Sequence, residues 1–189
     1  MDADFAATVQ NLAARQAIHD VVTRYCRGVD RMDRALLLSC YHADAIDDHG
    51  IFVGGPEAFA DWAFALHAGL QSAHQHIITN HSCEIAGDTA HCETYWMFAG
   101  MHHDGKLTIG GGRYIDRMER RGGEWRIAAR KCVPDWGGVP SQSWLSPAAA
   151  AALASGGNTA RDTTDCSYER PLAVAADRVG LVFDFASQA

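Results

Sequence analysis

Apolar residues recur at helical spacing in the first part of the chain. A stripe over residues 10–29 predicts an amphipathic helix, and it consists of Ala14, Ile18, Val21, Val22, Tyr25 and Val29. Asp33 is placed to cap a short second helix over RALLLSCY, and Pro56 stands at the first position of a third. The stripe of this third helix comprises Phe59, Trp62, Ala63, Leu66 and Leu70. Between these two helices, AIDDHGIFV predicts a hairpin that turns near Gly50.

From residue 74 onward the pattern is that of strands joined by short turns. The pairs Gly87-Asp88, Asp104-Gly105 and Gly122-Gly123 divide this part into four segments of roughly a dozen residues each. The segments are rich in aromatic and β-branched residues, as in ETYWMFAGM and EWRIAARKCV. They predict an antiparallel meander. Helices followed by a sheet indicate an α+β domain whose helices pack on one face of the sheet.

The length suits one domain with a terminal extension. We assign residues 1–140 to the α+β domain. Beyond Trp136 the chain becomes loop-like and weakly patterned, so residues 141–189 are expected to be a partly ordered C-terminal extension.

The composition excludes several classes of function. With 48% hydrophobic and 21% charged residues, the 189-residue chain resembles an ordinary soluble globular protein. A formal net charge of −7 argues against nucleic acid, because no basic face is available to neutralise phosphates. The six cysteines are spread evenly without a C-x-x-C pair, which fits neither a zinc knuckle nor a disulfide framework. Without a recognisable signal peptide or membrane-spanning run, we expect a cytoplasmic protein with reduced thiols.

One face of the third long strand combines glycines with polar residues. Counting by twos places Arg113, Arg117 and Glu119 on one face and Gly110, Gly112, Tyr114, Asp116 and Met118 on the other. The glycines either leave room for a ligand or mark bends beside a buried tyrosine. Tyr114 and Asp116 are therefore candidate substrate-binding residues.

The segment HQHIITNH, residues 74–81, holds three histidines in eight positions. Such a cluster can bind a metal, supply a general base, or pack without a chemical role. Polar side chains on both faces of a strand suit a polar-lined cavity better than a dry core. For a metal, only His74 and His76 are identifiable as ligands, whereas a catalytic zinc needs three convergent protein ligands. We therefore expect no metal.

Four motifs carry a resemblance to a known family: RYCRGVDRMD, YHADAIDDHG, QHIITNHSCEIAGDTA and GGRYIDRMERRGGEWRIAARKCVPDW. In this order they resemble the SnoaL-like, nuclear-transport-factor-like family, over roughly residues 10–136. The resemblance implies a cone-shaped α+β barrel, in which a curved antiparallel sheet has helices packed on its concave face. Scytalone dehydratase, hexachlorocyclohexane dehydrochlorinase and bile acid dehydratase have this fold.

In those enzymes an aspartate late in the first helix supports a histidine at the start of the strand after the third helix. The matching residues here are Asp30 and His76, and Tyr25 matches a tyrosine of the bile acid dehydratase. The sequence departs from scytalone dehydratase at Ala99, Gly112 and Tyr114, where that enzyme has a histidine, a serine and an asparagine. These departures place the substrate in doubt, but not the base.

The same residues are chemically sufficient for proton abstraction. A neutral imidazole takes up a proton near neutral pH, and a carboxylate on its Nδ1–H fixes the tautomer and stabilises the imidazolium. A phenol, Tyr25 or Tyr114, can donate a hydrogen bond to an oxygen that gains charge, and no cofactor is needed. Asp30 could instead merely terminate the helix, and His76 could be a buried structural histidine. Further substrate-binding candidates are His49, Asp48, His81 and Trp136.

These observations predict a cofactor-independent lyase that acts on a small cyclic or aromatic molecule by proton abstraction and elimination. Water is the first choice of leaving group, and halide and formaldehyde are alternatives that use similar machinery. A ketone isomerase or polyketide-type cyclase is the alternative enzyme, in which Tyr114 and a protonated Asp116 would form the oxyanion hole. A non-catalytic ligand-binding subunit, or an assembly subunit like a dioxygenase β subunit, is the third possibility. Because the meander carries more apolar side chains than one buried face absorbs, we also expect a homo-oligomer, a dimer or trimer.

Overall fold

The computed structural model describes residues 3–140 and 160–170. The chain divides into two units, Met1–Val139 and Pro140–Ala189. In the second unit, the described residues contain one 3-10 turn, Cys166–Tyr168. The expected partial order of residues 141–189 concerns a segment that lies largely outside the described residues.

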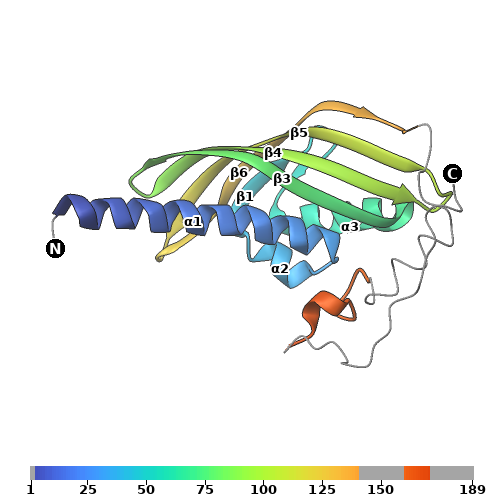
Figure 1. The fold of residues 1–189 in the computed structure, drawn as a ribbon, viewed down its shortest axis with the longest axis horizontal. Coiled ribbons are helices and arrows are strands. Elements are labelled where there is room, and N and C mark those ends of the chain that lie inside the picture. Colours follow the sequence, from blue (N-terminus) through green and yellow to red (C-terminus); the bar gives the residue numbers. More distant parts are fainter. Residues whose placement is uncertain (1–2, 141–159, 171–189) are drawn as a thin grey trace, which may run out of the picture. The chain divides into compact units, whose positions relative to one another are not determined.

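Three helices precede the long strands, as the apolar stripes predicted. They are α1 (Ala3–Asp30), α2 (Arg34–Leu38) and α3 (Pro56–Leu70). The Asp33 carboxylate accepts the backbone N–H of Leu36 at 2.9 Å, which confirms the predicted cap of α2. Helix α1 begins earlier than its apolar stripe, because its first turns extend beyond the end of the sheet (Figure 1). No helix of the described segments combines the length and apolar character that crossing a membrane requires.

The strands form one six-stranded sheet in the order β2-β1-β6-β5-β4-β3. Their bounds are β1 (Tyr41–Asp48), β2 (Val53–Gly54), β3 (Gln71–Ala86), β4 (Thr89–His102), β5 (Leu107–Arg121) and β6 (Glu124–Gly138). The predicted α+β class, the hairpin and the meander are confirmed. Two details differ from the expectation: β1 pairs with β6 in parallel, and the sheet is curved but open rather than a closed barrel.

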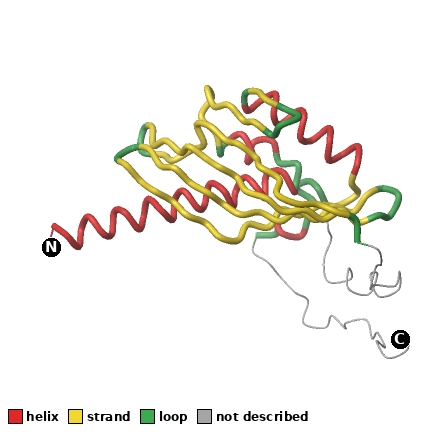
Figure 2. The backbone as a smooth tube through the Cα atoms, turned by 90° about the horizontal axis from the view of Figure 1, so that it is seen from above, coloured by secondary structure: helices red, strands yellow, loops and turns green. Residues whose placement is uncertain are grey.

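Irregular register accompanies the curvature of the sheet, whose strands bend as one layer (Figure 2). The pairing shifts by one residue between Ile78 and His81 and again between Gly111 and Gly112. An extra residue on one strand bends it and increases its twist. Helices α1, α2 and α3 all lie on one side of the sheet (Figure 1). The curved sheet and these helices together form the core.

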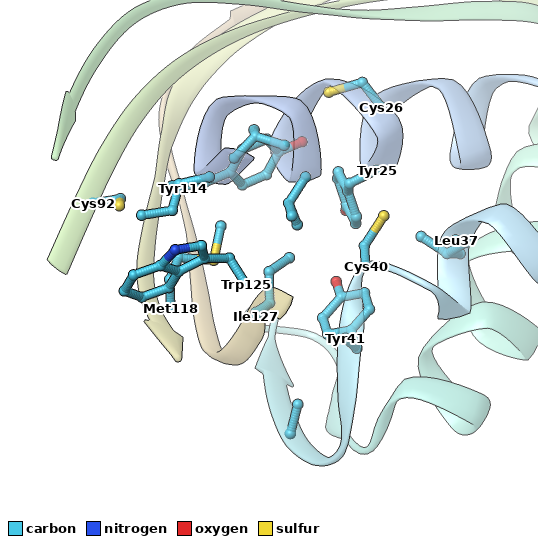
Figure 3. Close-up of a cluster of buried hydrophobic side chains, with 14 of the residues drawn as sticks. Tyr25, Cys26, Leu37, Cys40, Tyr41, Cys92, Tyr114, Met118, Trp125 and Ile127 are labelled. Atoms are coloured by element: carbon cyan, nitrogen blue, oxygen red, sulfur yellow. The ribbon is translucent and has the colours of Figure 1, made fainter. Parts of the chain in front are cut away.

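The core consists of buried side chains from the helices and the inward face of the sheet (Figure 3). Alternation in β5 follows the predicted faces: Tyr114, Asp116 and Met118 are buried, whereas Arg117 is exposed. Helix α1 contributes a stripe at helical spacing, comprising Ile18, Val21, Val22, Tyr25 and Val29. The predicted core stripe and the predicted inward face of β5 therefore meet in one hydrophobic core.

The opposite face of the sheet retains large apolar side chains at its surface. Met97 is 42% exposed, and Ile77, Tyr95 and Met101 are exposed to a similar degree. They occupy the two adjacent strands β3 and β4. Trp96 and Phe98, their neighbours in sequence, face the interior instead, because successive side chains of a strand alternate between faces.

We propose that this outer apolar face associates with a second copy of the chain. Met97→Lys together with Tyr95→Lys should shift the protein toward the monomer, since two like-charged patches would then oppose each other across a symmetric contact. Scattering-coupled size-exclusion chromatography at micromolar concentration measures the change, with Ile46→Lys, at an exposed site on β1, as the control. A wild-type protein that elutes as a monomer would contradict the proposal.

Candidate active site

A cavity of about 290 Å³ lies between the concave face of the sheet and helices α1 and α3. The helices contribute Tyr25, Val29, Phe59, Trp62, Ala63, Leu66 and His67. The sheet and the turn after β1 contribute His49, Gln71, His76, Trp96, Phe98, Thr108, Ile109, Gly110, Tyr114, Cys132 and Gly137. Most of this surface is apolar and aromatic, which suits a small cyclic molecule. The polar groups that line it are few and clustered.

The predicted pair of Asp30 and His76 is present at the cavity wall. Asp30 is the last residue of α1, and His76 lies on β3. The Nδ1 atom of His76 lies 2.7 Å from Oδ1 of Asp30. The backbone N–H of His76 also donates to both carboxylate oxygens, at 3.1 and 3.0 Å. Because the carboxylate occupies Nδ1, the Nε2 atom of the ring is the one left to exchange a proton.

Two further histidines surround this pair. The His74 and His67 rings stack with centroids 4.1 Å apart, and each also meets the His76 ring edge-on. The Nε2 atom of His74 donates toward the carbonyl oxygen of Val29, at 3.3 Å. His67 lies in the last turn of α3, and its Nδ1 is hydrogen-bonded to Oε1 of Gln71, at 2.9 Å. These rings pack against His76 and fix its orientation, and His67 also lines the cavity.

Asp30, His74 and His76 could also present three donor atoms to a metal, since these atoms lie within 4.8 Å of one another. From the sequence, only His74 and His76 were identified as possible metal ligands. Asp30 is a third possible ligand, and it becomes evident only in the structure. The Asp30 carboxylate is nevertheless bonded to two N–H groups of His76. A cation between these groups would have to displace the ring N–H bond. The geometry therefore favours a hydrogen-bonded dyad.

A second aspartate–histidine pair faces the same cavity from the β1–β2 hairpin. Nδ1 of His49 makes a very short hydrogen bond with Asp47, which is fully buried. Asp47 also accepts the hydroxyl of Tyr41, at 2.5 Å. The Nε2 atom of His49 lies 3.5 Å from the hydroxyl of Tyr25. Since β1 and β3 lie near opposite edges of a curved sheet, the two pairs approach the cavity from different sides.

The floor of the cavity contains a buried cation between two phenols. The Arg130 guanidinium lies 4.1 Å from the ring centres of both Tyr25 and Tyr114. It donates two hydrogen bonds of 2.7 Å to Asp116. Burial disfavours the charged guanidinium, but the charge and hydrogen bonds of Asp116 outweigh that effect and raise the pKa of Arg130 above its ordinary value. Arg130 therefore stays positively charged beneath the cavity.

The two phenols keep their protons at neutral pH. Burial raises the pKa of Tyr25 well above its usual value, although Arg130 acts in the opposite direction. Burial likewise raises the pKa of Tyr114. Protonated phenols can donate a hydrogen bond to an oxygen of a bound molecule.

Glycines of β5 make room for the indole of Trp96. A Cβ atom at Gly112 would lie 2.6 Å from the Trp96 ring and 2.2 Å from the carbonyl oxygen of Val133. Gly110 lines the cavity directly. The two glycines therefore have different roles. Gly110 leaves space for a ligand, and Gly112 allows the Trp96 ring and the carbonyl group of Val133 to come close to β5.

Five of the predicted site residues line or support the cavity: Asp30, His76, Tyr25, Tyr114 and His49. Four others do not line it: Asp48, His81, Asp116 and Trp136. Asp48 instead accepts the backbone N–H of Gly50 in the hairpin turn, at 2.9 Å. Asp116 lies beneath the floor, where both of its carboxylate oxygens accept hydrogen bonds from Arg130, so it does not face a bound molecule as the isomerase alternative required.

His81 lies too far along β3 to reach the cavity, and a bulge in β6 turns Trp136 away from it. His81 bonds to Thr94 through Nδ1, at 2.7 Å, further along β3 than the cavity. Trp136 is paired with Gly111 and its indole covers that glycine, since a Cβ there would meet the ring at 2.5 Å. Gly111 faces away from the side that carries Gly110 and Tyr114, so Trp136 lies on the outer face and is 51% exposed.

Asp47, His67 and Arg130 are the functional candidates that the sequence analysis missed. Asp47 could have been found by counting, because residues two apart in an extended chain share a face and Asp47 precedes His49 by two. His67 stands one turn after Ala63 on the apolar stripe of α3. Arg130 stands between Ala129 and Lys131 in sequence, and its burial depends on Asp116 across the sheet.

Comparisons with known proteins agree with this architecture. The profile of the SnoaL-like domain matches residues 10–131. A hexachlorocyclohexane dehydrochlorinase, LinA type 3, from Novosphingobium barchaimii LL02 shares 21% identity and superimposes with a TM-score of 0.66, covering 74% of this chain and 99% of the other. A putative scytalone dehydratase from Novosphingobium aromaticivorans shares 16% identity with a TM-score of 0.64, covering 74% and 96%.

A third structure, a protein of unknown function from Mycobacterium tuberculosis, shares 25% identity with a TM-score of 0.61. The match covers 68% of this chain and 75% of that protein. No curated protein sequence matches the chain significantly.

Proposed function

The chain belongs to the SnoaL-like family, and from this premise we propose that it is a lyase that eliminates water from a small cyclic or aromatic molecule. The observation that carries the proposal is the 2.7 Å contact between Asp30 and Nδ1 of His76 at the wall of an apolar cavity. Two structural neighbours are named as a dehydrochlorinase and a putative dehydratase, both of which are eliminating enzymes. Their names supply the reaction class that we carry over to this chain.

His76 is the proposed general base. Its Nε2 lone pair takes a proton from the carbon next to a carbonyl group, and the resulting imidazolium is stabilised by the Asp30 carboxylate. The electron pair of the broken C–H bond moves toward the carbonyl oxygen and then forms the new C=C bond as the group at the β carbon leaves. The protonated phenol of Tyr25 or Tyr114 can donate to the oxygen that gains charge.

His49 is the proposed general acid. A hydroxyl group leaves poorly as hydroxide, so its departure requires a proton, whereas chloride leaves without one. His49 borders the cavity, and its Nδ1 is bonded to the buried Asp47, which fixes the orientation of the ring. Its Nε2–H can then protonate the departing oxygen. This second supported histidine favours loss of water over loss of halide.

The apolar walls select the substrate class. Phe59, Trp62, Trp96 and Phe98 surround the space between the polar groups. Flat or cyclic carbon skeletons bury well against such rings, and the aromatic walls limit access of water to the intermediate. A β-hydroxy ketone within or fused to a six-membered ring matches both the polar groups and the walls.

The proposal is tested with a panel of cyclic and benzo-fused β-hydroxy ketones, incubated with the protein in D₂O. Proton NMR and ultraviolet absorbance follow formation of the conjugated enone, and NMR follows deuterium at the α carbon. We expect enone formation with at least one member of the panel, and α-deuteration of the saturated parent ketones. A panel that shows neither would contradict the proposed activity.

His49→Gln should separate the two kinds of leaving group. With a β-hydroxy ketone we expect elimination to fall by about a hundredfold or more, because general-acid assistance is lost. With the matching β-chloro ketone, corrected for spontaneous reaction, the loss should be less than about tenfold, since no proton is needed on chloride. Asp47→Asn should behave like His49→Gln, and Asp48→Asn is the matched control. Equal losses for both leaving groups would exclude His49 as the acid.

A further inference from the structure

A second cluster of titratable side chains lies outside the cavity, where β3 and β4 pair. Cys83 and Cys92 are directly opposite each other in the two strands, and their Sγ atoms are 3.3 Å apart. His81 lies on β3 two residues before Cys83, so its side chain is on the same face. One donor atom from each of these three residues lies within 4.8 Å of the others.

The His81 ring is oriented as a metal-binding imidazole would be. Its Nδ1 is hydrogen-bonded to the hydroxyl of Thr94, at 2.7 Å. Its Nε2 is buried and has no hydrogen-bond partner among the described residues. Ligand histidines usually use one ring nitrogen for the metal and have the other bonded to a polar group, which fixes the tautomer. An unsatisfied buried nitrogen beside two thiols otherwise has an energetic cost.

We propose that His81, Cys83 and Cys92 form a zinc-binding site. Two thiolates and an imidazole are a donor set that Zn²⁺ prefers, and two thiolates neutralise its charge within the buried region. In tetrahedral zinc sites with Zn–S distances of about 2.3 Å, sulfur atoms are separated by roughly 3.8 Å. The observed separation needs only a small outward rotation of the two thiols to reach that value. Both cysteines are already buried, at 6% and 0% exposure.

His19 from α1 is the side chain available for the fourth position. Its ring centroid lies 5.5 Å from that of His81, and the two planes are nearly perpendicular. With Zn–N bonds of about 2.0 Å, two imidazoles on one tetrahedral ion have ring centres roughly 5 Å apart. A side-chain rotation of His19 would therefore complete the site. The ion would join α1 to the β3–β4 pair and stabilise the fold.

This site is separate from the proposed chemistry. The cavity lining includes none of its three ligands among the described residues. Metal removal should therefore leave the dyad intact and lower the thermal stability of the protein instead. Chelation of the bound ion is expected to lower the melting temperature while elimination at room temperature continues.

The test is a titration of the reduced, metal-free, full-length chain with Co²⁺ as a spectroscopic substitute for Zn²⁺. We expect a thiolate-to-cobalt charge-transfer band that saturates at about one ion per chain and is abolished by Zn²⁺. Cys83→Ser and Cys92→Ser should each remove most of this band. His81→Ala should weaken binding by at least about tenfold, and His19→Ala should weaken it less. Cys26→Ala, at a buried cysteine elsewhere in α1, is the matched control and should bind normally.

The thiolate-to-cobalt band distinguishes this site from the other possible metal site, formed by Asp30, His74 and His76, because that site contains no thiolate. Binding without a charge-transfer band, or a band that persists in the Cys83→Ser/Cys92→Ser double variant, would overturn the proposal. Wild-type protein that binds no cobalt after reduction would also overturn the proposal. This holds even if the protein is isolated with a Cys83–Cys92 disulfide. If a variant fails to fold, X-ray absorption of the wild-type zinc complex decides, because two sulfur neighbours at about 2.3 Å are required.

Discussion

His76→Ala should lower the rate of elimination by about a hundred- to ten-thousandfold, because the substitution removes the group that accepts the proton. The loss should be in kcat, with a small change in KM, because the apolar walls that bind the substrate are retained. Steady-state kinetics on the most active β-hydroxy ketone measures both parameters. Deuterium exchange at the α carbon of the saturated ketone should fall in parallel.

His91→Ala is the matched control for this experiment, since His91 is an exposed histidine on the neighbouring strand β4. Its kinetics should equal those of the wild type. A folded His76→Ala protein, with normal circular dichroism and ligand binding, that retains wild-type turnover would remove His76 from the mechanism.

Asp30→Asn should be impaired by roughly a thousandfold or more, through its effect on His76. In the wild type the carboxylate accepts both the backbone N–H and the Nδ1–H of His76. An asparagine can still accept one of these bonds, but its amide group then donates toward Nδ1. The proton is consequently forced to Nε2, the atom that must be free to act as the base. The amide also cannot stabilise the imidazolium by charge.

Nitrogen NMR of the imidazole distinguishes this effect from general damage to the fold. The wild-type spectrum should show the proton of neutral His76 on Nδ1, and the Asp30→Asn spectrum should show it on Nε2. Asp20→Asn, on an exposed turn of α1, should change neither the tautomer nor the activity. An Asp30→Asn protein with the wild-type tautomer and a large loss of activity would show that Asp30 acts by another route.

The sequence predicted the dyad because helical and strand spacing are regular where Asp30 and His76 stand. The α1 stripe places Tyr25 and Val29 in the core, and Asp30 follows at the end of the same helix. His76 lies in the part of β3 from Ala73 to Ile78, where the pairing with β4 is regular between two register shifts. The resemblance to the SnoaL-like family connected these two positions, which are far apart in the chain. Their contact could not have been derived from either segment alone.

The errors of the sequence analysis are concentrated at irregular strand pairing. Strict alternation would place His81 and Cys83 on the opposite face from His76, but the bulge between Ile78 and His81 puts all three on the same face. The bulge beside Gly112 inserts Asp135 into β6, which leaves Trp136 opposite Gly111 on the outer face. Such shifts depend on pairing across strands. The alternation of residues along a single strand does not reveal them.

Burial of charge was equally difficult to predict. Arg130 and Asp116 are both fully buried and are joined by two hydrogen bonds. In sequence, Asp116 is followed by Arg117 and Arg130 by Lys131, and neither segment alone indicates a buried ion pair. Their partnership follows from the antiparallel register of β5 and β6, which pairs these two positions directly. Only the assembled sheet shows that Asp116 lies beneath the cavity as the partner of Arg130.

A double-mutant cycle on Asp30 and His76 tests the central claim most directly, because that claim is that the two residues act as one unit. It compares the elimination rates of Asp30→Asn, His76→Ala and the double variant with that of the wild type. We predict that the double variant loses no more activity than His76→Ala alone, since an aspartate without its histidine has no base to support. A loss equal to the product of the two single losses would show that the residues act independently, and it would contradict the dyad.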